Sequence, residues 1–211
     1  MQPIHDLLYL LSNAFLIPTL LGTLAAFAYG TYVVGQYLSE LADHRHNRAA
    51  LRDLFAGPPT QSRFAGYQWR GAFARFARAL SKYDDFPALI EKETADIELE
   101  MHARIERLGI MAKTGPMLGL IGTLIPLQPA LAGLARGDMQ AMGANLQIGF
   151  TTTVIGLLAG GTCYAIGVIY RNWFQQDISD LNFLTAIWAA PKNNYEQSLQ
   201  SPIAAELEKA R

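Results

Sequence analysis

The sequence predicts an all-α integral membrane protein with three transmembrane helices and long cytoplasmic helical extensions, its N-terminus outside and its C-terminus in the cytoplasm. Two observations predict this fold: three long uncharged stretches, and a one-sided distribution of Lys and Arg. Of the 211 residues, 51% are apolar and only 17% are charged. Globular proteins average about 25% charged residues. The low charged fraction therefore directs attention to the segments of the chain that carry no charge.

Residues 14–38, 114–135 and 146–170 contain no Asp, Glu, Lys, Arg or His. Each stretch exceeds the roughly 20 residues that a helix needs to cross about 30 Å of hydrocarbon. The alternative is three buried helices of a soluble protein, but such helices rarely run this long without a charge on their outer face. No Lys or Arg precedes the first stretch, so we expect a retained helix and not a cleaved signal peptide.

The orientation follows from the cationic side chains. Sixteen of the 17 Lys and Arg residues lie in residues 39–113 or after residue 170, and only Arg136 lies between the second and third stretches. The positive-inside rule places these charge-rich segments in the cytoplasm. The predicted layout is an outer segment 1–13, helix 14–38, a cytoplasmic helical domain 39–113, helix 114–135, an outer loop 136–145, helix 146–170, and a cytoplasmic helix and tail 171–211.

The predicted cytoplasmic part consists mainly of helices separated by short breaks. We expect the first membrane helix to continue to Phe55 and to end at Gly57-Pro58-Pro59, because proline and glycine break helices. A second helix is predicted from about Gln61 to Lys82, with aromatic residues spaced by three to four positions. Interleaved Arg and aromatic residues can also bind RNA, but an amphipathic packing face explains the same spacing.

Two further apolar stripes predict long helices that extend the second and third membrane spans. The first precedes the second span and comprises Ile90, Ile97, Met101, Ile105 and Leu108. The second follows the third span and comprises Phe174, Ile178, Leu181, Leu184 and Trp188. Together these stripes predict a helical bundle in the cytoplasm.

Several classes of function lack support. A net charge of −1 gives no electrostatic reason to expect a nucleic-acid partner. His44 and His46 lie two positions apart and point in different directions on a helix, so no metal site is expected. The acidic run between Glu91 and Glu106 lacks the loop pattern of a calcium site and is interpreted as a solvated helix face. No catalytic triad or phosphate loop is visible, so neither an enzyme nor a cofactor is expected.

The second and third spans each carry a face of small residues at four-residue spacing. In the second span the face comprises Gly115, Gly119 and Thr123, and Gly122 widens it. In the third span it comprises Asn145, Gly149, Thr153, Gly156 and Gly160. Such faces let membrane helices approach closely, and ordinary helix packing would explain a single one of them.

Hydroxyl groups on both small faces indicate a role in addition to helix packing. Thr152 adds a hydroxyl beside Thr153, and Pro126 cannot donate to the carbonyl of Gly122. These groups predict a polar spot at membrane depth, which is acceptable inside protein or along a wet path. The spans hold no ionisable side chain, whereas a proton relay normally uses one. If protons move here, the titrating group must come from another chain.

The run from Gly115 to Thr123 resembles the A-P-L-L-G-L-L-G-T segment of the MotA/TolQ/ExbB proton-channel family, and residues 153–157 resemble that family's T-x-x-G-L segment. The likeness covers about residues 88–188, and the layout of the first half agrees with it. Three positions depart from the family pattern: Pro126 replaces a frequent Gly, Ile148 a usual Glu, and Thr162 a frequent Pro. The short cytoplasmic loop and the absence of a fourth span disfavour a flagellar-type MotA, so we expect a divergent ExbB/TolQ-like branch.

The resemblance implies a homopentamer in the cell inner membrane, arranged around a single-span partner like ExbD, TolR or MotB. The partner's intramembrane Asp would take up and release protons, and Thr123 and Thr153 match the family's two pore-facing threonines. The expected function is a channel subunit of an energy-transducing motor that powers envelope transport or a related process. The alternatives are a non-conducting membrane scaffold and, with no visible catalytic set, a membrane enzyme; the coupling ion stays open between H⁺ and Na⁺.

Overall fold

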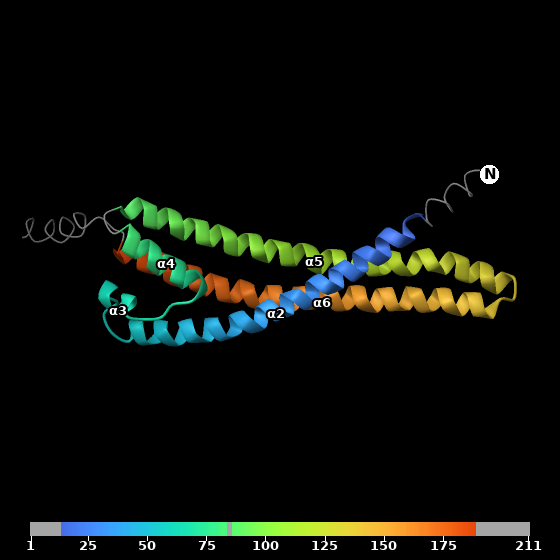
Figure 1. The fold of residues 1–211 in the computed structure, drawn as a ribbon, viewed down its shortest axis with the longest axis horizontal. Helices are drawn as coiled ribbons and strands as arrows, with labels where there is room; N and C mark the ends of the chain where they lie inside the picture. The colour runs from blue at the N-terminus through green and yellow to red at the C-terminus, as the bar shows by residue number, and fades with distance from the viewer. Residues whose placement is uncertain (1–13, 84–85, 189–211) are drawn as a thin grey trace, which may run out of the picture. The chain divides into compact units, whose positions relative to one another are not determined.

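The computed structural model describes residues 14–83 and 86–188, so the predicted outer segment 1–13 and most of the predicted tail lie outside the described residues. The elements are α2 (Leu16–Phe55), α3 (Gln61–Ala65), α4 (Gly71–Lys82), α5 (Pro87–Ala135) and α6 (Met139–Trp188), as Figure 1 shows. No strand occurs in the described ranges, which confirms the predicted all-α fold.

The three long helices, α2, α5 and α6, are each long and apolar enough to cross a membrane. This confirms the three predicted candidate spans. Each span also continues as one helix into a charged segment: α2 runs on to Phe55, α5 begins at Pro87, and α6 ends at Trp188. α5 stays helical through Pro116, Pro126 and Pro129.

The chain divides into two compact units. The first comprises residues Met1–Glu40 and Ala103–Asn172, and we call it the membrane unit because it contains the three uncharged stretches. The second comprises residues Leu41–His102 and Trp173–Arg211, and we call it the charged unit. The long helices contribute a part to each unit, and each unit is described by itself below.

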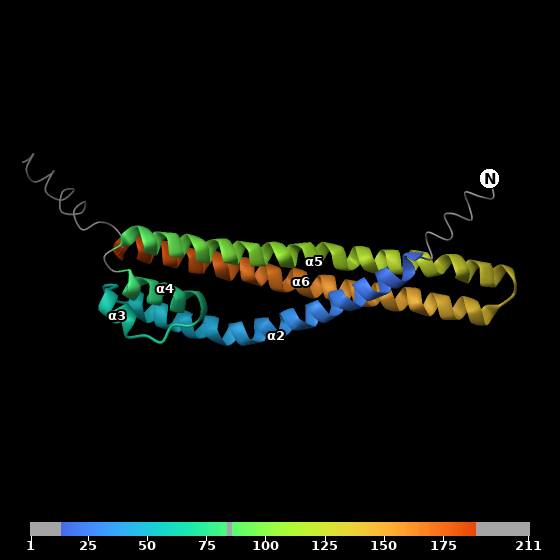
Figure 2. The ribbon, with the colours of Figure 1, turned by 45° about the horizontal axis from the view of Figure 1, so that its top comes forward.

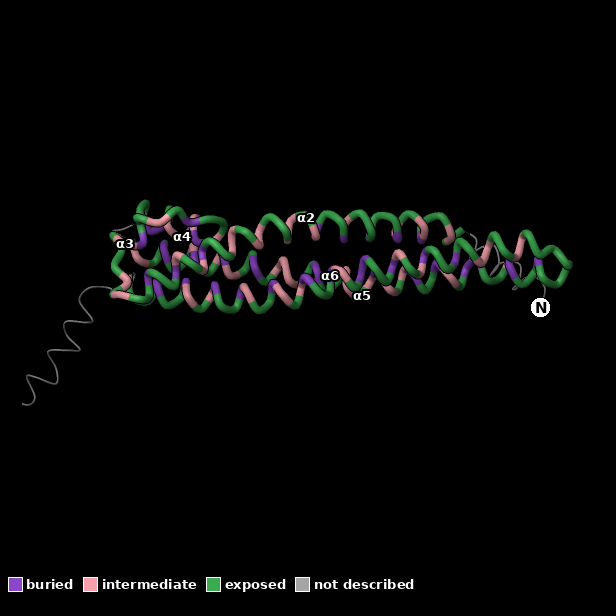
Figure 3. Tube along the Cα trace, turned by 90° about the horizontal axis from the view of Figure 1, so that it is seen from below, coloured by how far each residue is buried: buried purple, intermediate pink, exposed green. Residues whose placement is uncertain are grey.

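In the membrane unit, α5 and α6 run side by side and α2 packs across them (Figures 1 and 2). A tight turn joins α5 to α6, in which Gly137 takes a φ of +75° that favours glycine. The Asp138 carboxylate then accepts the backbone N–H of Ala141 at 2.9 Å and caps the start of α6. The buried positions of α2 lie on its side toward α5 and α6 (Figure 3).

The outer surface of the membrane unit is apolar. Large side chains that are more than half exposed line its helices, among them Ile17, Leu21, Leu24, Met117, Leu120, Leu124, Phe150 and Leu157. Exposed apolar surface on this scale is unfavourable in water but suits hydrocarbon. The surface therefore agrees with a unit that lies in a membrane.

The charged unit has a core of stacked aromatic rings. Phe64, Phe73 and Phe76 are at most 1% exposed, and the Phe64 ring lies 4.5 Å from Trp69 and 5.0 Å from Trp188 of α6. This burial confirms the packing interpretation of the aromatic spacing. The predicted single helix 61–82 is wrong, however, since α3 ends at Ala65 and α4 begins at Gly71 with a φ of +57°.

The predicted apolar stripes of α5 and α6 are largely buried, and most of their residues belong to the charged unit. Ile90, Ile97, Leu181 and Leu184 are at most 2% exposed. The acidic face of α5 is partly paired, since Arg75 of α4 donates to Glu93 and Glu100. No group of three or more His, Cys, Asp or Glu side chains that could hold a metal lies within the described part of the chain.

Candidate functional site

The predicted small faces of α5 and α6 meet in the membrane unit at backbone-to-backbone distance. A Cβ built on Gly115 would lie 2.9 Å from the Gly156 carbonyl oxygen and 2.9 Å from the Gly160 nitrogen. A Cβ on Gly156 would lie 2.6 Å from the Gly115 carbonyl oxygen. Cβ atoms essentially never come closer than 3.0 Å to such atoms. Only glycine therefore fits these positions at the observed helix separation.

The interface continues toward the predicted threonines. A Cβ on Gly119 would lie 3.2 Å from the Cα of Thr153, and one on Gly149 would lie 3.4 Å from the Cα of Thr123. A Cβ on Gly122 would lie 2.7 Å from the Thr152 hydroxyl oxygen. All six predicted glycines thus lie between α5 and α6, and Gly119, Gly122 and Gly149 lie against the threonines.

The hydroxyls of Thr123 and Thr153 both reach the Gly119 carbonyl, Thr153 at 3.0 Å and Thr123 at 3.4 Å, and Thr123 has a shorter bond within its own helix. Thr153 donates across the interface to the Gly119 carbonyl at 3.0 Å, so it bonds α6 to α5. Thr123 donates within its own helix to the Leu120 carbonyl at 2.7 Å. Both side chains are only half-buried, so a group outside the α5–α6 pair can still approach their oxygen lone pairs.

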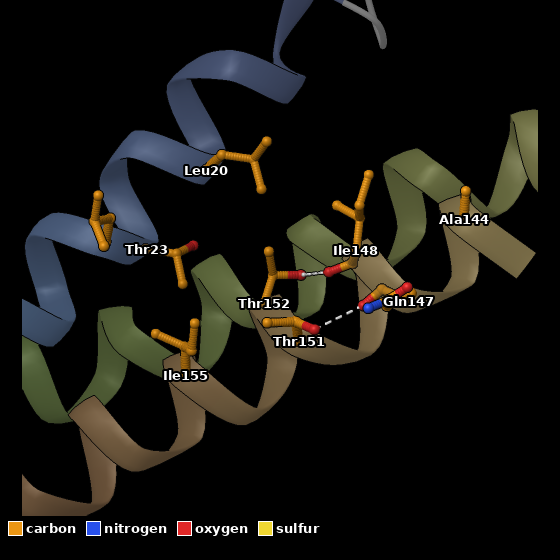
Figure 4. A pocket seen from close by; sticks show the side chains of 9 residues that line it. Leu20, Thr23, Ala144, Gln147, Ile148, Thr151, Thr152 and Ile155 are labelled. Carbon is orange, nitrogen blue, oxygen red and sulfur yellow. Dashed lines mark hydrogen bonds between the residues drawn. The ribbon is translucent and has the colours of Figure 1, made fainter.

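Thr152 lies against Gly122 of α5 and also faces α2. Its hydroxyl donates to the Gly149 carbonyl at 2.8 Å, and the residue is buried. It lines a pocket of about 630 Å³ between α2 and α6. The lining residues are Leu20, Thr23, Leu24, Ala144, Gln147, Ile148, Thr151, Thr152 and Ile155. Figure 4 shows Thr23 and Thr152 facing this pocket from the two helices.

Three polar residues of this pocket were not among the predicted site residues: Thr23, Gln147 and Thr151. Thr23 is buried and donates to the Thr19 carbonyl one turn earlier at 2.8 Å. The four-residue spacing of Thr19 and Thr23 in the first uncharged stretch is the sequence signal that could have identified this polar face. Gln147 is exposed and carries the pocket's one side-chain amide.

Pro126 is buried one turn beyond Gly122 in α5. Because proline has no amide hydrogen, the Gly122 carbonyl lacks the helix donor that it would receive from any other residue at this position. The site therefore combines a carbonyl that lacks its i+4 helix donor with the hydroxyl of Thr152, which lies against Gly122.

The chemistry that this arrangement offers is hydrogen bonding without titration. Residues 114–135 and 146–170 contain no Asp, Glu, Lys, Arg or His. The hydroxyls of Thr123, Thr152 and Thr153 each donate to a backbone carbonyl, so their oxygens remain available as acceptors. The site can accept hydrogen bonds from water or from a protonated acid, but it cannot hold a proton itself near neutral pH.

A family model for the MotA/TolQ/ExbB proton channel family matches residues 69–182, which is more than half of the chain. The chain belongs to the MotA/TolQ/ExbB proton channel family. The match includes all of α4 and α5 and most of α6. No curated protein and no solved structure matches the sequence. Membership in this family associates the chain with ion-driven energy transduction at a membrane.

Proposed function

We propose that the chain is a proton-channel subunit of an inner-membrane motor, assembled as a homopentamer around a single-span partner that carries an intramembrane Asp. The observation that carries this proposal is the charge-free, hydroxyl-bearing α5–α6 interface in a member of a proton channel family. An interface without an ionisable group can build a proton path only if a second chain supplies one. The chain is proposed to be a channel component and not an enzyme.

The two threonines would make the partner's acid tolerable in the membrane. A carboxylic acid buried without hydrogen bonds costs several kcal/mol, and its ionised form costs far more. In the observed arrangement Thr153 donates to Gly119 and can accept from the protonated acid. When the acid ionises, rotation of the Thr hydroxyl would let it donate to the carboxylate. Thr123 acts in the same way from α5.

The direction of the proton path follows from the distribution of charge. The segments rich in Lys and Arg favour a cytoplasmic position for the charged unit and an outer position for the N-terminus. Each proton that moves inward down a membrane potential of 100 mV releases about 2.3 kcal/mol. The motor would convert this free energy into movement of the partner, which would power transport or a related process in the cell envelope.

The test is proton flux through the chain and its partner in liposomes. The partner is first identified by co-purification with the proteins encoded beside this chain, as a single-span protein with an intramembrane Asp. Thr153→Val and Thr123→Val preserve side-chain shape but remove the hydroxyls, and we expect each to reduce flux about tenfold or more. Thr153→Ser keeps a hydroxyl and should retain most of the flux.

The matched control is Thr31→Val. Thr31 is exposed on α2 and donates only to the Phe27 carbonyl of its own helix, at 3.0 Å. Undiminished flux in the Thr123→Val/Thr153→Val double variant would contradict the proposed roles. A complex that assembles but carries no flux even with the wild-type chain would favour the alternative, a non-conducting scaffold for a transport complex.

A further inference from the structure

The charged unit buries a carboxylate that the proposed channel function does not use. Asp177 lies on α6 beyond the third uncharged stretch, and its side chain is only 12% exposed. It faces two side chains of α2, His44 and Arg48. Buried acids are usually paired or protonated, so the partners of Asp177 determine its state.

Arg48 is shared between two carboxylates one turn apart on α6. Its Nη2 lies 3.1 Å from Asp177 Oδ1, and its Nη1 lies 2.8 Å from Asp180 Oδ2. Its Nε is buried without a hydrogen-bond partner among the described residues. A single guanidinium therefore compensates two negative charges, and the cluster is one positive charge short when both acids are ionised.

His44 stands where the missing charge would be. Its Nδ1 lies 3.6 Å from Asp177 Oδ2, which is just beyond hydrogen-bonding distance. Its ring stacks on Trp173 of α6 with a centroid separation of 4.3 Å and an interplanar angle of 9°. The stacking fixes the imidazole beside the carboxylate. A single proton placed between the two groups would supply the hydrogen bond that the present distance lacks.

We propose that His44 and Asp177 form a proton-binding site that belongs to this chain alone and lies outside its membrane spans. Uptake of one proton brings the cluster of His44, Arg48, Asp177 and Asp180 from a net charge of −1 to neutrality. It also joins α2 to α6 by a hydrogen bond between Asp177 and His44. Arg48 then retains its ion pair with Asp180.

The titration of the two groups supports this assignment. Burial, with a smaller contribution from the charge of Asp180, raises the pKa of Asp177 to about 6 against the lowering effect of Arg48. Burial and the charge of Arg48 lower the pKa of His44. The imidazole is therefore neutral at pH 7 and can accept at Nδ1. The proton goes to the carboxyl group, which becomes the donor.

The charged and titratable groups facing Asp177 in the described structure come from two elements. α2 contributes His44 and Arg48, and α6 contributes Asp180, whose own pKa burial also raises. One positive and one negative fixed charge thus bracket the site. Removing the charge of Arg48 should raise the pKa of Asp177, and removing the charge of Asp180 should lower it, so substitution can test the assignment.

The test is a pH titration of the full chain alone in nanodiscs, with ¹³C at the Asp side-chain carboxyl carbons and NMR detection. One carboxyl signal should titrate near pH 6, and this signal should be absent from the spectra of Asp177→Asn. In Asp180→Asn its midpoint should move down, because a repelling charge is lost and Arg48 pairs with Asp177 alone. In Arg48→Gln the midpoint should move up.

The matched control is Asp96→Asn, since Asp96 is a half-exposed acid paired with Lys92 of its own helix. It should leave the midpoint near pH 6 unchanged. The proposal is overturned if no carboxyl titrates above pH 5, or if that titration persists in Asp177→Asn. If Asp177→Asn fails to fold, a midpoint that stays the same in both Asp180→Asn and Arg48→Gln overturns it equally. No partner protein is present, so failure of the proposed channel function does not affect the result.

Discussion

The membrane unit and the charged unit use the same helices but hold them together by opposite means. In the membrane unit, α5 and α6 touch along a strip of glycine backbone, with the Thr153–Gly119 hydrogen bond across it. In the charged unit, bulky rings such as Phe64 and Phe76 fill the space, and ion pairs surround them. Lipid removes the hydrophobic reason for helices to associate. In hydrocarbon, close backbone contact holds the helices together instead. In water, the burial of bulky apolar side chains does so.

The first way to break this contrast is to empty the aromatic core. Phe76 is fully buried, and Phe76→Ala should destabilise the charged unit by about 3–5 kcal/mol through lost burial and a cavity. Pulse proteolysis would show faster cleavage of the charged unit, with the membrane unit less affected. Phe86→Ala is the control because Phe86 is 63% exposed. Equal effects of the two changes would refute the aromatic core.

The second way is to change the charge of Asp177 with pH. A carboxyl pKa of about 6 in the folded chain exceeds the ordinary 3.8, so the folded state binds the proton more tightly. Stability from this group is therefore fully present below about pH 4 and is lost as pH rises through 6, by up to about 3 kcal/mol. Between pH 5 and 7.5, Asp177→Asn should show a smaller loss of stability than the wild type.

Denaturation of both proteins at each pH measures this difference, and Asp96→Asn should behave like the wild type. The half-exposed Lys92–Asp96 pair lies within one helix and contributes little. If the wild type and Asp177→Asn lose the same stability over this pH range, Asp177 has an ordinary pKa.

The third way is to separate α5 from α6. Gly160→Ala places a methyl group against Pro116 and within 3.1 Å of the Ala112 carbonyl oxygen, whereas Gly161 has nothing within 4 Å of an added Cβ. We expect Gly160→Ala to cost about 1–3 kcal/mol by overpacking. Gly161→Ala should be neutral or slightly stabilising because alanine favours helix. Thermal denaturation in detergent compares the two neighbours, and equal melting temperatures would show that the helices are not in backbone contact.

The smallest expected effect is on the hydrogen bond between the helices. Thr153→Val removes the donor to Gly119 and should cost about 0.6 kcal/mol, with about 1.7 as an upper value for such bonds in membranes. Thr31→Val is again the control. A small change in stability alongside a large loss of proton flux would separate the role of the hydroxyl in ion movement from its role in packing.

Sequence reasoning reached the features that are local in the chain. The uncharged stretches and the absence of breakers predicted three long helices, and the four-residue spacing of Gly115 and Gly119 predicted a close-packing face. The break at Gly66 and Gly71 was missed although both glycines are visible, because the apolar spacing across them still fits a helix.

The rest depends on which helices meet and in what register. Arg48 and Asp177 are 129 positions apart, and nothing local marks them as partners. The sequence analysis considered His44 only together with His46, its neighbour in the chain, and expected no metal site there, whereas its contacts are Trp173 and Asp177 of α6. For Thr23 the spacing from Thr19 marks a polar face of α2, but only the packing of α2 against α6 places that face at a pocket.

The glycine strip also limits how this protein can change over generations. Every substitution of Gly115, Gly156 or Gly160 adds at least a Cβ, and each such atom would collide with backbone or proline across the interface. The contact of Gly30 in α2 with Ala159 leaves 3.5 Å and tolerates alanine. Substitution is therefore open at Gly30 of α2 and closed at these three glycines of α5 and α6, where any change of helix separation requires coordinated replacements on both helices.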